Sequence, residues 1–258
     1  MDTPPKTAAE LEQLLPAVVA ADNPNLDGIW EFYASPDAAG KVLKKTQKAR
    51  PFAKGSKEAL HFAVLCCAFG ISGNEQVIID YLTAPADVPV PPEKGKEKEP
   101  PKYEKKLWDN GITSAICYGR RNSYKDQAII ALAFVKCKAF APKLAEMMKS
   151  LPDQPEFSHL RAIAIYLDAV PDKSCADELA RILNAVKGHA QTVPQNDYPK
   201  LPPPQDRMRP QIRELMTART LYRLGDKDKL AENVLRSYLS DPVKVYANFA
   251  RRVLETGR

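Results

Sequence analysis

The sequence has 258 residues, a hydrophobic fraction of 44%, a charged fraction of 27% and a formal net charge of +6. These are the proportions of an ordinary globular protein, and the length is enough to bury one continuous core without disulfides or metal. No apolar run approaches the roughly 18 residues of a membrane-spanning helix, and residues 1–10 lack the basic start and apolar core of a signal peptide. We therefore expect no membrane partner, and a cytoplasmic chain unless it is a fragment of a larger exported protein.

In chain order, the sequence alternates amphipathic helices with short turns and two proline-rich breaks. The predicted helices cover residues 7–21, 35–48, 56–83 (a pair), 107–120, 124–137, 141–151, 156–170, 173–187, 209–225, 227–240 and 243–256. Pro142 suits the first turn of its helix, where the missing N–H costs nothing. Gly225 is placed as a C-terminal stop, and Asp226 and Asp241 stand where they could cap the helices that follow.

The first break covers residues 84–106 and combines six prolines with alternating charge. Such a composition disfavours both a packed helix and a strand, so we expect an exposed loop. The second break, residues 188–208, also holds Val193, Tyr198 and Leu201. This apolar content predicts an extended strap that lies along a groove between helices.

Four helices carry apolar or small residues at the same offsets of 0, 3, 4 and 7, which defines a recurring helical face. The four sets are Leu60-Ala63-Val64-Cys67, Ile112-Ala115-Ile116-Gly119, Leu160-Ile163-Ala164-Leu167 and Leu215-Ala218-Arg219-Tyr222. Helix pairs that repeat in this way bury one face against their neighbours and form a solenoid. The sequence thus predicts an all-α fold, a HEAT-like α-α superhelix of about a dozen helices, as a single domain over residues 1–258.

The cysteines are odd in number and lie mostly in helical apolar stretches, without CxxC spacing. They are Cys66, Cys67, Cys117, Cys137 and Cys175. We interpret them as small core residues in a reducing compartment. His61 with Cys66 and Cys67 is the one local cluster that resembles a metal site, and adjacent helical cysteines point about 100° apart. We therefore assign no metal site.

The C-terminal 100 residues or so contain the pattern R…A-R-x-L-Y-R-x-G-D. The matching residues are Arg213, Ala218, Arg219, Leu221, Tyr222, Arg223, Gly225 and Asp226. With SHLRAIAIYLDAVPDKSCADELARIL before it, this stretch resembles the C-terminal HEAT-like helical region of bacterial FAD-dependent oxidoreductases. In that family a flavin-binding domain precedes the helix pairs, so the resemblance implies an accessory domain of a larger protein.

The glycines do not supply a flavin site. A dinucleotide-binding turn needs G-x-G-x-x-G so that the backbone can approach the pyrophosphate, and none of the eleven glycines occurs at G-x-G spacing. We expect no cofactor in this chain. The expected partner is then a protein, or the missing catalytic domain itself.

The basic charge leaves a second class of function open. One run of Lys and Arg covers residues 41–57, which we interpret as a solvated face. A concave solenoid face rich in arginine can also neutralise phosphates, and the alternative function is a nucleic-acid-binding solenoid, possibly a DNA glycosylase. The candidates for partner binding are Trp108, Arg207, Arg209, Arg213, Arg219 and Arg223.

Each candidate also has a structural interpretation. Trp108 suits a core anchor at the start of a helix, and the arginines can pair with acids such as Glu214, Asp226 and Asp228 or cover apolar surface with their stems. The sequence has no G-x-S-x-G elbow and only three scattered histidines, so we assign no catalytic residue. The function expected from the sequence is a non-catalytic structural or binding module.

Overall fold

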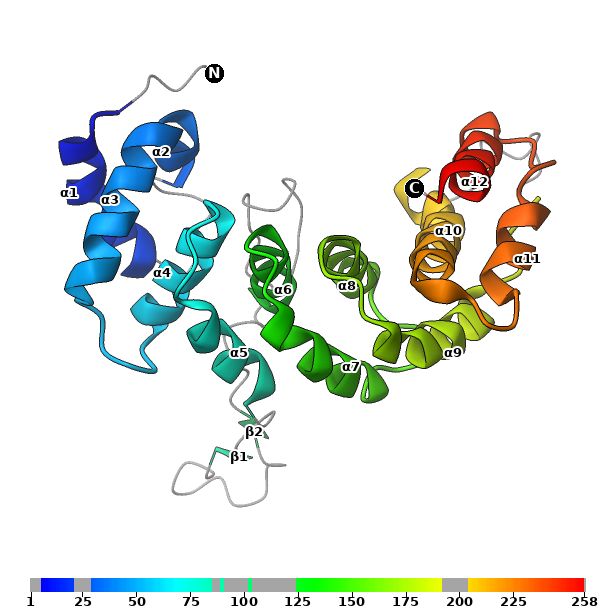
Figure 1. Ribbon diagram of the computed structural model, residues 1–258, viewed down its shortest axis with the longest axis horizontal. Coiled ribbons are helices and arrows are strands. Elements are labelled where there is room, and N and C mark those ends of the chain that lie inside the picture. The colour runs from blue at the N-terminus through cyan, green and yellow to red at the C-terminus, as the bar shows by residue number, and fades with distance from the viewer. Residues whose placement is uncertain are drawn as a thin grey trace. The chain divides into compact units, whose positions relative to one another are not determined.

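The computed structural model describes residues 6–20, 29–84, 89–90, 102–103, 124–191 and 204–257. Over these ranges the chain is all-α apart from one pair of two-residue strands (Figure 1). It divides into two compact units, residues 1–137 and 138–258. The expected single domain depends on how these units are joined, and it stays a prediction.

The first unit contains helices α1 to α6 and strands β1 and β2. Their bounds are α1 Ala8–Ala20, α2 Ile29–Ala34, α3 Pro36–Ala49, α4 Lys57–Ala68, α5 Glu75–Thr83, β1 Pro89–Val90, β2 Lys102–Tyr103 and α6 Tyr124–Phe134. The first helix begins with a capping box, in which the Thr7 N–H donates to Glu10 Oε2 at 2.8 Å and the Glu10 N–H donates to Thr7 Oγ1 at 3.3 Å. These two bonds satisfy N–H groups that the first helical turn leaves without partners.

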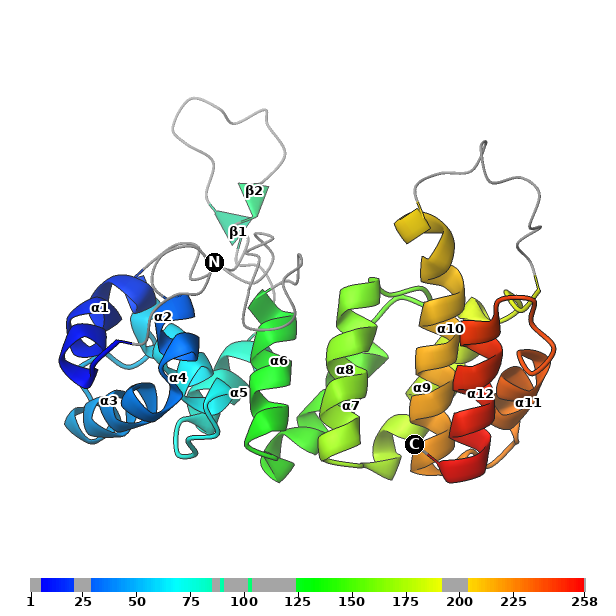
Figure 2. The ribbon, with the colours of Figure 1, turned by 90° about the horizontal axis from the view of Figure 1, so that it is seen from above.

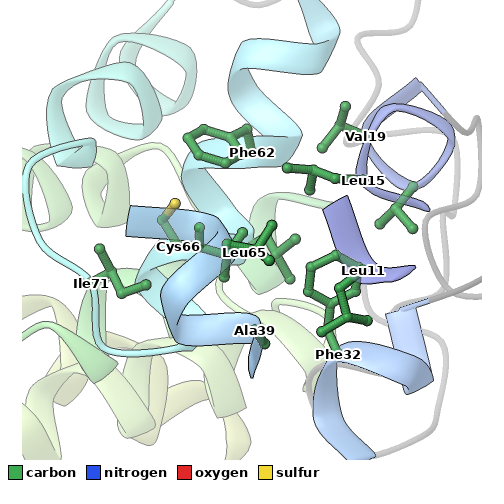
Figure 3. Packing of buried hydrophobic residues seen from close by; sticks show 12 residues of the cluster. Leu11, Leu15, Val19, Phe32, Ala39, Phe62, Leu65, Cys66 and Ile71 are labelled. Atoms are coloured by element: carbon green, nitrogen blue, oxygen red, sulfur yellow. The ribbon is translucent and has the colours of Figure 1, made fainter. Parts of the chain in front are cut away.

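A buried cluster of the first unit lies between α1, α2, α3 and α4. Leu11, Leu15, Phe32, Leu65 and Cys66 all lie in one buried cluster (Figure 3). Helix α2 was not predicted, because its six residues are too few to show a helical period. It forms because Phe32 is completely buried in this cluster, so tertiary contacts rather than local pattern stabilise it.

Helices α4 and α6 end in the same way. The N–H of Gly70 donates to Cys67 O and that of Ile71 to Cys66 O, both at 2.9 Å, while the N–H of Lys136 donates to Ala133 O and that of Cys137 to Leu132 O, both at 3.0 Å. This is the Schellman arrangement, whose penultimate residue adopts a left-handed conformation. Gly70 has φ 69° and Lys136 has φ 51°. The predicted helix 124–137 therefore stops at Phe134.

The second unit contains six α-helices and two short 3₁₀ turns within its described residues. Their bounds are η2 Lys138–Phe140, α7 Ala141–Lys149, α8 Phe157–Ala169, η3 Lys173–Cys175, α9 Ala176–Val186, α10 Pro204–Gly225, α11 Leu230–Ser237 and α12 Lys244–Thr256. Helices α7, α9 and α11 form one row, and α8, α10 and α12 form a second row against it (Figure 1). The two rows pack together because each helix has an apolar side. In α9 this side consists of Leu179, Ile182, Leu183 and Val186, which are buried at helical spacing.

The helices predicted in the described residues are confirmed, with ends displaced by a few residues, and the one predicted at 107–120 lies outside them. Pro142 does lie in the first turn of α7. Gly225 is the last residue of α10 and has φ 104°. Asp226 accepts hydrogen bonds from the N–H groups of Leu230 and Glu232, both at 3.0 Å, and so caps α11 as predicted.

Two expectations about the breaks were wrong in part. The first was expected to contain no strand, yet Pro89–Val90 pairs antiparallel with Lys102–Tyr103. Pro89 is tolerated because it is the first residue of its strand, where the missing donor costs least. The strap was expected to run to residue 208, but α10 already begins at Pro204, a residue whose fixed φ suits a first helical turn. Val193, Tyr198 and Leu201 lie outside the described residues.

Candidate partner-binding surface on helices α8 and α10

The predicted binding residues fall into three groups. Trp108 lies outside the described residues, and Arg207 and Arg209 lie in the first two turns of α10, where only the backbone is described. Arg213, Arg219 and Arg223 follow along the same helix. They do not share a face, because six residues place Arg213 about 120° around the helix from Arg219.

Arg219 and Arg223 converge on one carboxylate. Arg219 donates to Asp168 Oδ2 and Arg223 to Asp168 Oδ1, so Asp168 of α8 bridges two arginines one turn apart on α10. The side chains of the three residues are 26%, 27% and 27% exposed for Arg219, Arg223 and Asp168. The group is therefore partly shielded from water and still reachable from it.

The two helices lie side by side and run in the same direction (Figure 2). Asp168 is near the end of α8, and its partners are near the end of α10. A register set by this contact places Arg161, seven residues before Asp168, level with the middle of α10. Ile165 of α8 and Ile212 and Met216 of α10 are half-buried, on the helical faces that hold these charges.

We name this set of seven residues the α8–α10 surface. It consists of Arg161, Ile165, Asp168, Ile212, Met216, Arg219 and Arg223. Arginine outnumbers acid on it, and half-buried apolar side chains share the helical faces of the charges. A surface of this composition is typical of the places where proteins bind other proteins, since arginine and methionine are enriched there and lysine is depleted.

Two of the acids proposed as arginine partners, Glu214 and Asp226, have other roles. Glu214 is buried, and its carboxylate accepts hydrogen bonds from the N–H groups of Gly188 and His189 at 2.8 and 2.9 Å and from the Tyr238 hydroxyl at 2.6 Å. Burial first, and then Glu214, raise the pKa of Tyr238 well above its usual range. This node ties the first residues of the second break to α10 and to the end of α11.

Asp241 acts beside this node. Its carboxylate accepts from the N–H of Gln191 and from the N–H of Val243, both at 2.8 Å. The sequence predicted that Asp241 caps α12, but the N-cap residue is Val243 and no side chain caps this helix end. Asp241 instead closes the turn before the helix and fixes Gln191, 50 positions away, which no local pattern indicates.

The fourth predicted repeat face was half wrong. Leu60-Ala63-Val64-Cys67 of α4 and Leu160-Ile163-Ala164-Leu167 of α8 are buried throughout. On α10, Leu215 and Ala218 are buried, but Arg219 and Tyr222 are half-buried. The buried side of α10 is rotated toward Glu214 and Leu221, because α10 contacts α8, α9, α11 and α12.

Asp168 was not predicted from the sequence, although the predicted repeat carried a signal. Aligning Leu160 with Leu215 aligns Asp168 with Arg223, and equivalent positions of successive repeats lie level on adjacent helices. Opposite charges at such positions predict a pair. In the basic run at 41–57, Lys41, Lys44, Lys45, Lys48, Arg50 and Lys54 are exposed as expected of a solvated face. Lys57 is half-buried and donates to Ala20 O at 3.0 Å.

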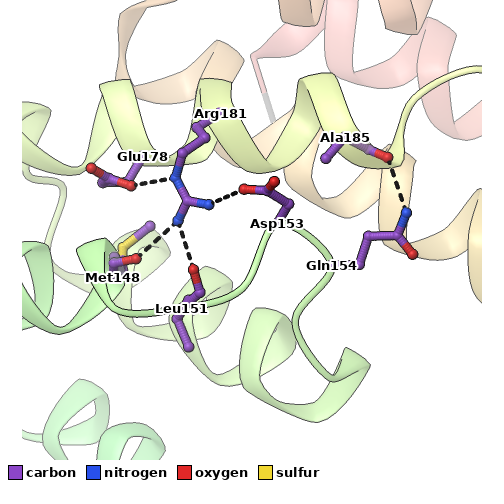
Figure 4. Close-up of polar contacts among 7 residues, drawn as sticks. All are labelled: Met148, Leu151, Asp153, Gln154, Glu178, Arg181 and Ala185. Atoms are coloured by element: carbon purple, nitrogen blue, oxygen red, sulfur yellow. Dashed lines mark hydrogen bonds and ion pairs between the residues drawn. The ribbon is translucent and has the colours of Figure 1, made fainter.

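A second arginine cluster holds α9 against the end of α7 (Figure 4). Arg181 donates to Glu178 at 2.8 Å and to Asp153 at 2.5 Å. Its Nη2 also donates to the carbonyl oxygens of Met148 and Leu151, at 3.2 and 3.0 Å. The four partners of this guanidinium, Glu178, Asp153, Met148 and Leu151, all lie within the second unit. Carbonyl groups at a helix end need donors, so we interpret Arg181 as a structural residue.

The part of the chain that the structure describes contains no group of three or more His, Cys, Asp or Glu side chains able to hold a metal. None of its helices combines the length and the apolar character that crossing a bilayer requires. Comparisons with family models, with curated proteins and with solved structures found no match. The proposal for the function of the chain therefore depends on the α8–α10 surface.

Proposed function

We propose that the chain is a helical-repeat binding module, in which a HEAT-like α-α superhelix presents the α8–α10 surface to a protein partner. The observation that carries the proposal is the composition of that surface: arginines on the same helical faces as the half-buried Ile165, Ile212 and Met216. Apolar side chains that are already half-buried lose little conformational entropy when a partner covers them.

The finer part of the proposal is that the module is the accessory domain of a larger FAD-dependent oxidoreductase-like protein. Its support is the motif in α10, where each described role is structural. Ala218 and Leu221 are buried, Arg219 and Arg223 bind Asp168, and Asp226 caps α11. A motif that organises helices rather than a reaction centre fits an accessory domain, and the flavin chemistry would belong to another part of the polypeptide.

Site-specific photocrosslinking tests the binding proposal. A photoreactive amino acid replaces Met216 in the full chain in cells of the native source, and the control variant carries it at Asn233, which is exposed on α11. We expect a discrete protein adduct from position 216 and none from position 233. Equal labelling at both positions, no adduct, or an adduct that nuclease removes would contradict the proposal.

The accessory-domain proposal has a separate test. An antibody raised against this chain should detect, in the native source, a polypeptide clearly heavier than 258 residues account for. Mass spectrometry of that band should find peptides from a flavin-binding segment. A band of only 258 residues' mass would overturn the accessory-domain proposal and leave the binding proposal to the crosslinking result.

A further inference from the structure

We propose that the α8–α10 surface binds an acidic peptide segment of its protein partner, and that the carboxylates of this segment replace Asp168 on Arg219 and Arg223. This inference rests on the proposed function and names the chemistry of the partner. In the absence of the partner, Asp168 would occupy the position that the partner's carboxylate takes in the complex.

The first support is geometric. Asp168 already shows that Arg219 and Arg223 can hold one carboxylate between them, each donating to a different oxygen. Planar guanidinium groups are suited to this kind of carboxylate recognition. The two arginines are one helical turn apart, so an acidic pair one turn apart on a partner helix would match their spacing.

The second support is charge. On the α8–α10 surface two arginines, Arg219 and Arg223, share a single acid, Asp168. A partner with carboxylates would balance this excess, and one with lysine or arginine would meet repulsion. Protein helices also supply apolar side chains for Ile165 and Met216, which a nucleic-acid backbone does not. The composition therefore favours an acidic amphipathic peptide over a polyphosphate.

The third support is the state of the arginine side chains. Arg219 Nε is buried and has no hydrogen-bond partner among the described residues, although its Nη2 binds Asp168. A buried donor without an acceptor costs free energy. A carboxylate in side-on contact uses Nε together with one Nη. A partner that displaces Asp168 and lets the guanidinium turn outward would therefore satisfy a donor that Asp168 does not.

The test begins with an unbiased selection. A phage-displayed library of random peptides, each about 16 residues long so that a helix of about four turns can form, is selected on the immobilised full chain. We expect enrichment of peptides with Asp or Glu pairs three or four residues apart, and loss of that enrichment on the Arg219→Gln, Arg223→Gln double variant. Selection of neutral or basic peptides, or an unchanged selection on the double variant, would overturn the inference.

Fluorescence anisotropy then measures the affinity of the best acidic peptide for the wild-type chain and for two variants. Arg223→Gln should weaken binding about tenfold, as expected for loss of one charge-assisted contact. Asp168→Asn should strengthen it several-fold, because the internal competitor is gone while both arginines remain. A gain in affinity cannot come from misfolding, so Asp168→Asn keeps the test clear if another variant is unstable. Unchanged or weaker binding by Asp168→Asn contradicts the inference.

Two controls separate the alternatives. Arg236→Gln removes an exposed arginine of α11 that pairs with Glu232 and should leave peptide affinity unchanged. A DNA duplex of similar length reports on phosphate binding: if Asp168→Asn strengthens duplex binding and not peptide binding, the surface recognises nucleic acid and the inference is wrong. A protein adduct at position 216 that persists in the Arg219→Gln, Arg223→Gln variant would refute the acidic-peptide inference alone and leave the proposed function standing.

Discussion

Arg181 concentrates more described hydrogen bonds on one side chain than its neighbours in α9 do, and two of them go to backbone carbonyls that end α7. The hydrogen bond to Glu178 is the main cause that raises the pKa of this guanidinium. Because the carbonyls of Met148 and Leu151 need a donor in a fixed direction, the planar fork of arginine suits the position better than the point charge of lysine.

We expect Arg181→Ala to lower the free energy of unfolding by about 2 kcal/mol, through the loss of charge-assisted bonds to carbonyls. Arg181→Lys should recover only part of this. Urea unfolding followed by circular dichroism measures both variants. Arg236→Gln, which removes an exposed ion pair, should cost well under 1 kcal/mol. If Arg181→Ala and Arg236→Gln lowered the free energy of unfolding equally, Arg181 would be an ordinary surface arginine.

The buried thiols make stability depend on pH. Burial raises the pKa of Cys66 from 9.0 to about 12 and that of Cys175 to about 11, and it raises the pKa of Cys67 as well. The folded state therefore holds these protons at a pH where the unfolded chain releases them. Their contribution is fully present below about pH 9 and is lost as the pH rises toward about 12.

We expect the free energy of unfolding to fall by up to about 1.4 kcal/mol per pH unit for each such thiol above about pH 9. Cys66→Ala should show a shallower fall than the wild-type chain, whatever its stability at neutral pH. Urea titrations at several pH values between about 8 and 10.5 measure the slope. Identical slopes would mean that Cys66 is not protected from ionisation in the folded state.

At the scale of elements, α4 and α6 end in the same Schellman arrangement, and this allows a matched pair of substitutions. Lys136 adopts φ 51° where the equivalent Gly70 has φ 69°, and a residue with a Cβ is strained in this conformation. No atom lies within 4 Å of a Cβ built on Gly70, so the cost there is conformational alone.

Lys136→Gly should stabilise the protein by about 0.5–1 kcal/mol, and Gly70→Ala should destabilise it by about 1 kcal/mol. Thermal and urea unfolding of the two variants measure both signs. If Lys136→Gly proves destabilising, the lysine side chain must contribute more than its backbone strain costs, and the equivalence of the two helix ends would be wrong.

The length and apolar pattern of a helix explain whether it could be predicted from the sequence. Long helices with a one-sided apolar pattern, such as α8 and α9, follow from the spacing of Leu160, Ile163 and Leu179. Helix α2 does not, because six residues hold no period and its formation depends on the burial of Phe32. Helix α10 was predicted, but its buried side differs from the predicted one, because contacts with four neighbouring helices decide which side is buried.

At the scale of the whole molecule, the two compact units raise the question of independent folding. Residues 138–258 contain the second unit with both of its rows of helices, and the Asp168 pairs and the Glu214 node lie entirely within it. We expect the fragment 138–258 to fold alone and to unfold in a single cooperative transition.

Circular dichroism and urea unfolding of that fragment test this expectation. A helical fragment with a sigmoidal transition would establish the second unit as a domain. A fragment with weak helicity and a gradual transition would instead support the single domain expected from the sequence. The Asp168→Asn variant of the fragment serves as the comparison, since a folded fragment should retain its helicity when one partly exposed ion pair is removed.

The sequence by itself determined the all-α class, the order and approximate bounds of most helices, the stop at Gly225 and the cap at Asp226. These follow from short-range physics: helical periodicity, the conformational freedom of glycine, and the capping of N–H groups within a few residues. Only the tertiary structure decided that Arg219 and Arg223 share Asp168, that Glu214 holds Gly188 and His189, and that Arg181 closes α7. Such contacts join residues 25 to 55 positions apart, and a charge or a carboxylate in a sequence does not state which of many distant partners it will meet when helices pack.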